Sequence, residues 1–285
     1  MSNFLIVELA VLAFYISCLA YIIKKDKKMI FFFLSTTVYA IIFENLNILL
    51  SFGKEGSYYY NKNFKLFFFE VPFFVVFAWS IIMYTSLKMA KALKIVEKSL
   101  PFIASLLVLL IDLAIDVVAI RLGYWVWVGY RFDEGYFGVP ANNFIGWLLV
   151  SFSFFYLDKK IKVKTNWLKY VLLPVISYLM FLAMFMPLIA LDSVLLLDKM
   201  QEFFVFIVIF VVFIFSIKIG ERKDKVDGFI YAMRFVFYLF GIYFIIAEKM
   251  YVENILLLLT SIMFMLIEIA LIIGEKCVLA RENFE

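Results

Sequence analysis

The sequence predicts an all-α protein, a polytopic transmembrane helix bundle in which residues 1–285 form a single integral membrane domain. Of the 285 residues, 66% are apolar and 20% are aromatic, and the mean hydropathy is +1.01. A soluble domain of this size could not bury so many apolar side chains. The chain also contains nine apolar runs of helix length, and its basic residues gather in alternate connections between these runs.

The nine runs predict about nine membrane spans, because a helix needs about 20 apolar residues to cross the bilayer core. The first run begins within the start MSNFLIVELA, which has no basic residue ahead of the apolar stretch, so we expect a retained span rather than a cleaved signal peptide. The predicted spans are residues 4–23, 29–52, 66–87, 100–120, 138–157, 170–191, 202–219, 229–247 and 255–273.

The basic residues predict the orientation of the bundle, because short connections rich in lysine and arginine stay in the cytoplasm. With the N-terminus outside, 20 of the 27 lysine and arginine residues fall in inside connections, at 24–28, 88–98, 159–169, 218–234 and 276–281. We therefore expect a multi-pass protein of the cell (plasma) membrane with its C-terminus inside.

The chain has no histidine and only two cysteines, Cys18 and Cys277. The lack of histidine excludes histidine-ligated di-iron sites, most haem ligation and histidine acid/base catalysis. Both cysteines fall near the predicted cytoplasmic face, where thiols stay reduced. We expect no metal and no cofactor, no nucleic-acid partner, and contact with membrane lipid.

Four carboxylates stand inside or at the end of predicted spans, in what we expect to be the outer half of the membrane. They are Glu44, Glu70, Asp112 and Asp116. The two aspartates are four residues apart and so share one helix face. Each such carboxylate costs about 2.5 to 3.5 kcal/mol on insertion scales, which requires a reason. Three amides are expected at the same depth, namely Asn47, Asn142 and Asn143.

The segment from Arg121 to Phe137 is too polar and glycine-rich to span a membrane, so we expect it to fold back as a cap over the outer mouth of the bundle. Aromatic residues gather in it and near it, and ring faces attract positive charge. The candidates for substrate contact are Tyr58, Tyr60, Trp125, Trp127, Tyr136 and Trp147.

A purely structural interpretation competes with the site. Buried carboxylates also act as hydrogen-bonded links between helices, and aromatic residues also anchor helices at the membrane interface. For Glu8 and Glu268 we favour the structural role. For Asp112 and Asp116, which form a pair beside the aromatic cap, we favour a functional one.

Three strings in this region resemble one family: D-L-A-I-D-V-V-A, G-Y-W-V-W and Y-F-G-V-P-A-N-N-F-I-G-W. They are similar to the central signature of membrane carotenoid-biosynthesis hydratases, the carotenoid 1,2-hydratase and bisanhydrobacterioruberin hydratase family. The resemblance covers about residues 40–150. It extends to Glu44, to Gly56 with Tyr58 and Tyr60 in a G-x-Y-x-Y arrangement, and to Val71-Pro72 with Trp79. The chain departs from the pattern at Val117, where a proline is expected, and around Asn47, where glycines are expected.

The resemblance implies a cofactor-independent hydratase that adds water across a terminal C=C bond of a carotenoid or related isoprenoid lipid. Neighbouring carboxylates in a low dielectric do not both ionise easily, so one of Asp112 and Asp116 is expected to keep a proton and act as the acid. The other aspartate, or Glu44, would take the proton from water, with Asn143 holding that water. Trp125 and Trp127 would face the carbocation.

Two other functions remain open on the sequence alone. The first is a membrane prenyltransferase, because D-L-A-I-D is also a D-x-x-x-D motif, although the chain has no second aspartate-rich motif for magnesium diphosphate. The second is a lipid or proton-coupled transporter, in which buried carboxylates are also common.

Overall fold

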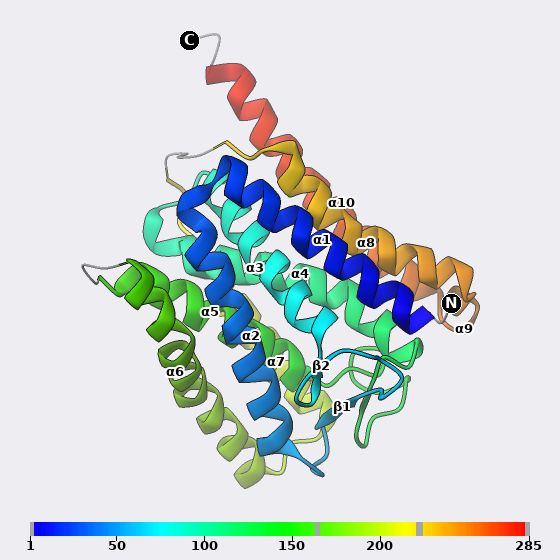
Figure 1. The fold of residues 1–285 in the computed structure, drawn as a ribbon. Helices are drawn as coiled ribbons and strands as arrows, with labels where there is room; N and C mark the ends of the chain where they lie inside the picture. Colours follow the sequence, from blue (N-terminus) through cyan, green and yellow to red (C-terminus); the bar gives the residue numbers. More distant parts are fainter. Residues whose placement is uncertain (1–2, 163–165, 221–224, 283–285) are drawn as a thin grey trace.

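The computed structural model describes residues 3–162, 166–220 and 225–282, and it confirms the all-α bundle. Between the long helices lie α9 (Met250–Glu253) and two single 3₁₀ turns, η1 (Lys27–Met29) and η2 (Glu97–Ser99). The long helices of the described residues, seen together in Figure 1, are α1 (Asn3–Lys25), α2 (Ile30–Ser51), α3 (Phe73–Ala92), α4 (Leu100–Arg121), α5 (Ala141–Lys160), α6 (Asn166–Leu195), α7 (Lys199–Phe215), α8 (Gly228–Ala247) and α10 (Ile255–Glu282).

Seven of these described helices are long and apolar enough to cross a membrane, namely α1, α2, α3, α4, α6, α8 and α10. The other two fall short for different reasons. Helix α7 has only 17 residues, and α5 begins with Ala-Asn-Asn and ends with Asp-Lys-Lys, which lowers its hydropathy. The protein is thus a helical membrane protein, whereas the count of nine spans stays a prediction.

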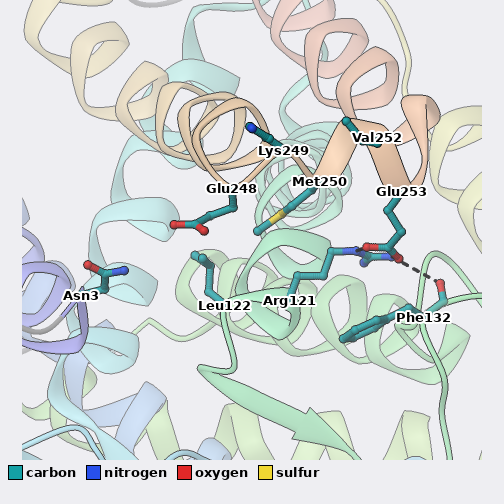
Figure 2. Close-up of a pocket in the computed structure, with 9 residues that line it drawn as sticks. All are labelled: Asn3, Arg121, Leu122, Phe132, Glu248, Lys249, Met250, Val252 and Glu253. Carbon is teal, nitrogen blue, oxygen red and sulfur yellow. Dashed lines mark hydrogen bonds and ion pairs between the residues drawn. The ribbon is translucent and has the colours of Figure 1, made fainter.

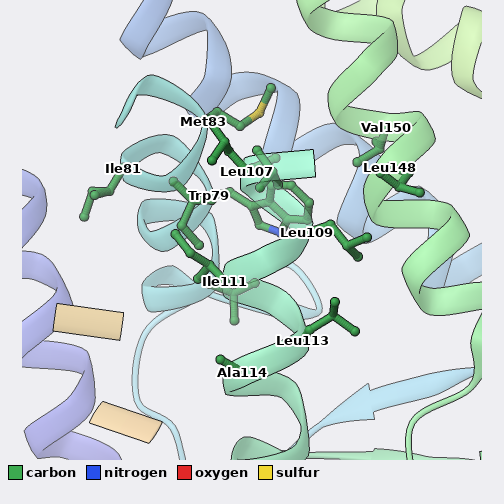
Figure 3. Packing of buried hydrophobic residues seen from close by; sticks show 14 of the residues in the cluster. Trp79, Ile81, Met83, Leu107, Leu109, Ile111, Leu113, Ala114, Leu148 and Val150 are labelled. Atoms are coloured by element: carbon green, nitrogen blue, oxygen red, sulfur yellow. The ribbon is translucent and has the colours of Figure 1, made fainter. Parts of the chain in front are cut away.

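Helix α4 lies at the centre of the bundle and packs against α3, α5, α7, α8 and α10. Its apolar side chains interdigitate with those of α3 and α5, as Figure 3 shows for Leu107, Leu109 and Ile111. Helix α8 comes especially close, because a Cβ atom at Gly241 would lie 3.2 Å from the carbonyl oxygen of Ala114 on α4. The two aspartates are therefore carried on the most enclosed helix.

Two short antiparallel ribbons lie at one end of the bundle, which we call the cap end. Strand β1 (Tyr58–Tyr60) follows α2 and pairs with β4 (Trp125–Trp127), which follows α4, so that Tyr58 faces Trp127 and Tyr60 faces Trp125. The second ribbon joins β2 (Phe67–Phe68) to β3 (Val71–Pro72) just before α3. The segment predicted to fold back as a cap is therefore tied to the connection between α2 and α3.

The third predicted span, 66–87, is displaced in the structure, where α3 runs from Phe73 to Ala92. Residues 66–72 instead enter the β2–β3 hairpin, which turns at Phe69 with a φ of 58°. Pro72 has no backbone N–H and stands before the first helical residue, where no donor is needed. The hydrophobic run thus contained a hairpin as well as a helix.

The opposite end, which we call the basic end, holds the connections rich in lysine. These connections touch one another: Ile95 forms a β-bridge with Ile219, and the Lys159 ammonium lies 3.6 Å from a Glu97 carboxylate oxygen. Three of the basic residues that predict the orientation of the bundle lie outside the described residues, namely Lys164, Arg222 and Lys223. The alternation of the connections fits the predicted topology, and which end faces outside stays a prediction.

Arg234 was assigned to a cytoplasmic connection, and this assignment is wrong. Helix α8 begins at Gly228, so Arg234 lies almost two turns inside the helix with no exposed side-chain surface. Its guanidinium forms an ion pair with Glu268 of α10, which is also fully buried. Glu268 therefore links helices, as the structural interpretation predicted.

Candidate functional site

A cavity of about 80 Å³ lies in the cap-end half of the bundle, and we call it the Glu44 cavity. Helices α2, α3, α4 and α5 supply its walls, and the β1–β4 ribbon supplies its remaining side. Its lining is aromatic and acidic, and contains neither lysine nor arginine. The residues that line it are Glu44, Tyr58, Tyr60, Phe74, Val75, Ala78, Trp79, Ile82, Ile115, Asp116, Trp125, Trp127, Asn143 and Trp147.

The Glu44 carboxylate is buried and accepts hydrogen bonds from three neutral donors. The Tyr58 hydroxyl lies 2.5 Å and the Tyr60 hydroxyl 3.0 Å from Oε2. The indole N–H of Trp79 donates to Oε1 over 2.7 Å. An indole nitrogen can only donate, so Trp79 needs this acceptor. The three hydrogen bonds favour the charged form of the carboxylate, whereas its burial favours the neutral form.

Asp112 and Asp116 meet a single amide. The Asn143 side-chain nitrogen donates to Oδ2 of Asp116 over 2.8 Å and to Oδ2 of Asp112 over 3.3 Å. The two carboxyl oxygens therefore lie no farther apart than the sum of these distances. Asp116 lines the cavity, whereas Asp112 lies behind it, fully buried. The Oδ1 atom of Asp112 meets no hydrogen-bond donor among the described residues.

The β1–β4 ribbon holds its aromatic side chains over the cavity. The rings of Tyr58 and Trp127 have centroids 4.8 Å apart, and those of Tyr60 and Trp125 are 5.8 Å apart. Burial, followed by the nearby Glu44 carboxylate, raises the pKa of both tyrosines well above the usual value. Both hydroxyls thus stay neutral and remain hydrogen-bond donors to Glu44.

Trp79 is the main site residue that the sequence interpretation did not assign. Its ring stacks on that of Trp147 with centroids 3.8 Å apart, and its N–H holds Glu44. A signal existed in the sequence: tryptophan in membrane helices concentrates at the interface, and a buried indole needs an acceptor. A tryptophan well inside an apolar run therefore indicates a buried hydrogen-bond acceptor nearby.

Eight of the predicted site residues meet around this cavity: Glu44, Asp116, Asn143, Tyr58, Tyr60, Trp125, Trp127 and Trp147. Glu70 does not, and its predicted place in the cavity is wrong. It stands in the hairpin before α3, where its half-exposed carboxylate pairs with the Lys62 ammonium at 2.6 Å. The displaced start of α3 is the cause.

Three further predicted residues also lie off the cavity. Asn47 points toward α6, where its amide oxygen accepts a hydrogen bond from the Tyr178 hydroxyl over 3.2 Å. Asn142 is half-buried on the first turn of α5 and is not part of the lining. Tyr136 packs against Phe144, with ring centroids 5.3 Å apart. Burial raises the pKa of Tyr136 to about 12, and nearby Asp112 acts in the same direction.

A larger, open cleft of about 680 Å³ lies elsewhere at the cap end, between the start of α1 and the turn after α8. Figure 2 shows that the Arg121 guanidinium points at Glu253 across this cleft. Arg121 also donates to the backbone oxygens of Val117 and Phe137, over 3.1 and 2.9 Å. Its donors thus hold the cap against α4 and α9, which is a structural task.

Residues 2–215 match the family model described as carotenoid biosynthesis protein. No curated protein and no solved structure matches the chain. The matched region contains every residue of the Glu44 cavity and ends at the last residue of α7.

Proposed function

We propose that this chain, which belongs to the carotenoid biosynthesis protein family, is a hydratase that adds water across a terminal C=C bond of a carotenoid or related isoprenoid. Its family assigns the protein to carotenoid biosynthesis, and its long apolar helices assign it to a membrane. The reaction, the substrate and the residues that act are our proposal. One observation carries it: two buried aspartates share one amide at the wall of an aromatic cavity whose lining contains no basic side chain.

The acid in this proposal is Asp116, because it lines the cavity whereas Asp112 lies behind it. Two buried carboxyl groups this close cannot easily both carry a charge, and no lysine or arginine lies in the cavity lining to balance them. A shared proton is therefore expected on the pair. Asn143 holds both carboxyl groups in place, so it positions the acid rather than the water.

The proposed reaction has two steps. The π electrons of the terminal double bond take the proton of the Asp116 carboxyl group and form a C–H bond, which leaves a tertiary carbocation and the Asp116 carboxylate. A water oxygen then bonds to the cation, and the proton released from this water returns to Asp116. The product is a tertiary alcohol, and the acid is restored without any redox change.

The size of the cavity supports reaction at the end of a chain. A cavity of about 150 Å³ accommodates a benzene molecule, and the Glu44 cavity measures about 80 Å³. It is thus suited to a few carbon atoms and not to a long polyene. The remainder of the substrate would lie among apolar helices, in the plasma membrane that we propose as its location.

The experiment compares carotenoids in a producing host with and without this chain. We expect a new product heavier by the mass of one water molecule. Asp116→Asn keeps the size and hydrogen bonds of the side chain but removes the acid, so the rate should fall about 10²- to 10⁴-fold, the usual contribution of general acid catalysis. Asp26→Asn, at the basic end, is the control and should retain the parent rate.

Other outcomes would overturn the proposal. Hydration at the parent rate by Asp116→Asn would exclude Asp116 as the acid. Transfer of a prenyl group from a prenyl diphosphate with magnesium, without hydration, would show a prenyltransferase. Movement of a lipid across sealed vesicles without chemical change would show a transporter.

A further inference from the structure

Glu44 has no basic partner among the described residues that line its cavity. Its carboxylate has three hydrogen-bond donors, and all of them are neutral. Among the described residues that line the cavity there is no lysine or arginine, while Asp116 adds a second carboxyl group. A buried charge is normally paired with an opposite charge. A cation that enters the cavity would therefore supply the opposite charge that the Glu44 carboxylate lacks.

Aromatic rings surround Glu44 in the cavity. Four of the five tryptophans of the chain line this cavity, and Trp167 is the only one elsewhere. Trp79 and Trp147 stack with ring centroids 3.8 Å apart, so each covers one face of the other, and the N–H of Trp79 donates to Glu44. Indole faces attract cations more strongly than other aromatic rings do. A carboxylate surrounded by tryptophans is the arrangement that recognises an organic cation.

The cavity also restricts the polarity and the size of such a cation. The remaining walls, including Phe74, Ala78 and Ile115, are apolar, so the cation must carry alkyl groups rather than a shell of water. The cavity is small, which limits the head of the ligand to a few carbon atoms. The ligand must also reach it within a bundle whose outer faces are apolar.

We propose that the Glu44 cavity binds long-chain tertiary ammonium ions, with the charged nitrogen beside Glu44 and its methyl groups against the tryptophans. The similarity of such an ion to a tertiary carbocation rests on the proposed hydratase function, whereas the binding rests on the cavity alone. In the reaction, the Glu44 carboxylate would then face and stabilise the carbocation, while Asp116 moves the proton.

The probe is N,N-dimethyldodecylamine, which is protonated at pH 7, and its neutral isostere is 2-methyltetradecane. Binding to the full chain in phosphatidylcholine nanodiscs is followed by tryptophan fluorescence, with empty nanodiscs correcting for partition into lipid. A Trp167→Phe background removes the one tryptophan outside the cavity. We expect saturable binding of the amine that is at least about tenfold tighter than that of the isostere.

Glu44→Gln keeps the shape of the side chain but removes its charge, and should weaken amine binding about tenfold or more. Glu8→Gln is the matched control. Glu8 is also buried and accepts two backbone N–H groups, each over 2.9 Å, but it does not line the cavity. This variant should bind the amine as the parent does.

Equal binding of the amine and the isostere by the parent protein would refute the proposal, as would unchanged amine binding by Glu44→Gln. The comparison of the two probes needs no variant, so it remains decisive if Glu44→Gln does not fold. Amine binding by a protein that never hydrates an isoprenoid would keep the cation site and refute the hydratase. Hydration without amine binding would do the reverse, and would leave Glu44 as a link between the ribbon and α2.

Discussion

Replacing Glu268 with glutamine should destabilise the bundle strongly, because it leaves the buried Arg234 without its counter-charge. The guanidinium donates to both oxygens of Glu268, to the Ser86 hydroxyl over 2.6 Å and to the Leu107 carbonyl over 2.8 Å. Both members of the pair have no exposed side-chain surface. Removing one member of a buried pair costs about 3 to 5 kcal/mol.

Because glutamine keeps one oxygen that can accept from the guanidinium, we expect a loss near the lower end, about 3 kcal/mol. The double variant Arg234→Met with Glu268→Leu removes both charges and leaves the Ser86 and Leu107 acceptors unfilled, together with the Tyr238 hydroxyl, which donates to Glu268 over 3.2 Å. Because replacing a whole buried ion pair with apolar residues is often neutral or stabilising, the double variant should be more stable than Glu268→Gln alone.

The assay measures the temperature at which half of the purified protein, in one detergent, has unfolded. Samples are heated to a series of temperatures, and the protein that remains folded is measured by size-exclusion chromatography. Asp133→Asn is the control, because Asp133 pairs with Arg131 on the surface, where the side chains are 69% and 74% exposed. It should leave the midpoint unchanged. A double variant no more stable than the single one would refute the reasoning, since the cost would not then come from an unpaired charge.

Three further predictions concern packing, pH and topology. Gly241→Leu should separate α8 from α4 and lower the midpoint, because even a Cβ atom would lie 3.2 Å from a backbone oxygen; Gly228→Ala, which meets no atom within 4 Å, should not. Burial, helped by Glu248, raises the pKa of Tyr124 from 10.0 to about 12. The neutral form is therefore favoured in the folded state, and the resulting stability is full below pH 10 and falls as the pH rises toward 12. Tyr124→Phe should remove this component from the pH dependence of the midpoint. Reporter fusions after residues 95, 163 and 225 should all report the cytoplasm, and an outside signal at any of them would contradict the predicted topology.

The helices and most of the cavity could be predicted because their signals are local. Eight of the nine predicted spans overlap closely with observed helices, since each apolar run is bounded by charged or polar residues. Asp116 and Asn143 could be placed at one depth because helix rise converts sequence distance into depth. The 2.8 Å hydrogen bond between them could not be predicted, because it also depends on how α4 and α5 are rotated about their axes.

The failures have two causes: apolar character does not distinguish backbone conformations, and a contact between distant segments leaves no local signal in the sequence. Residues 66–72 are as apolar as the helix that follows, yet they form a hairpin, and this moved Glu70 to the surface. Arg234 was misplaced because its partner Glu268 lies 34 residues later and on another helix. The pairing of β1 with β4 is likewise non-local, and neither strand alone carries a pattern long enough to predict it.

The position of the cavity along the chain also bears on the order in which the protein is made. All residues that line the Glu44 cavity lie between Glu44 and Trp147, so its walls can assemble while the second half of the chain is still on the ribosome. When α8 emerges, Ser86 and the Leu107 carbonyl are already in place to receive Arg234, whereas Glu268 arrives last. The cavity walls therefore do not depend on Glu268 for any residue, and a chain truncated before Glu268 would contain all of these walls together with Arg234 without its counter-charge.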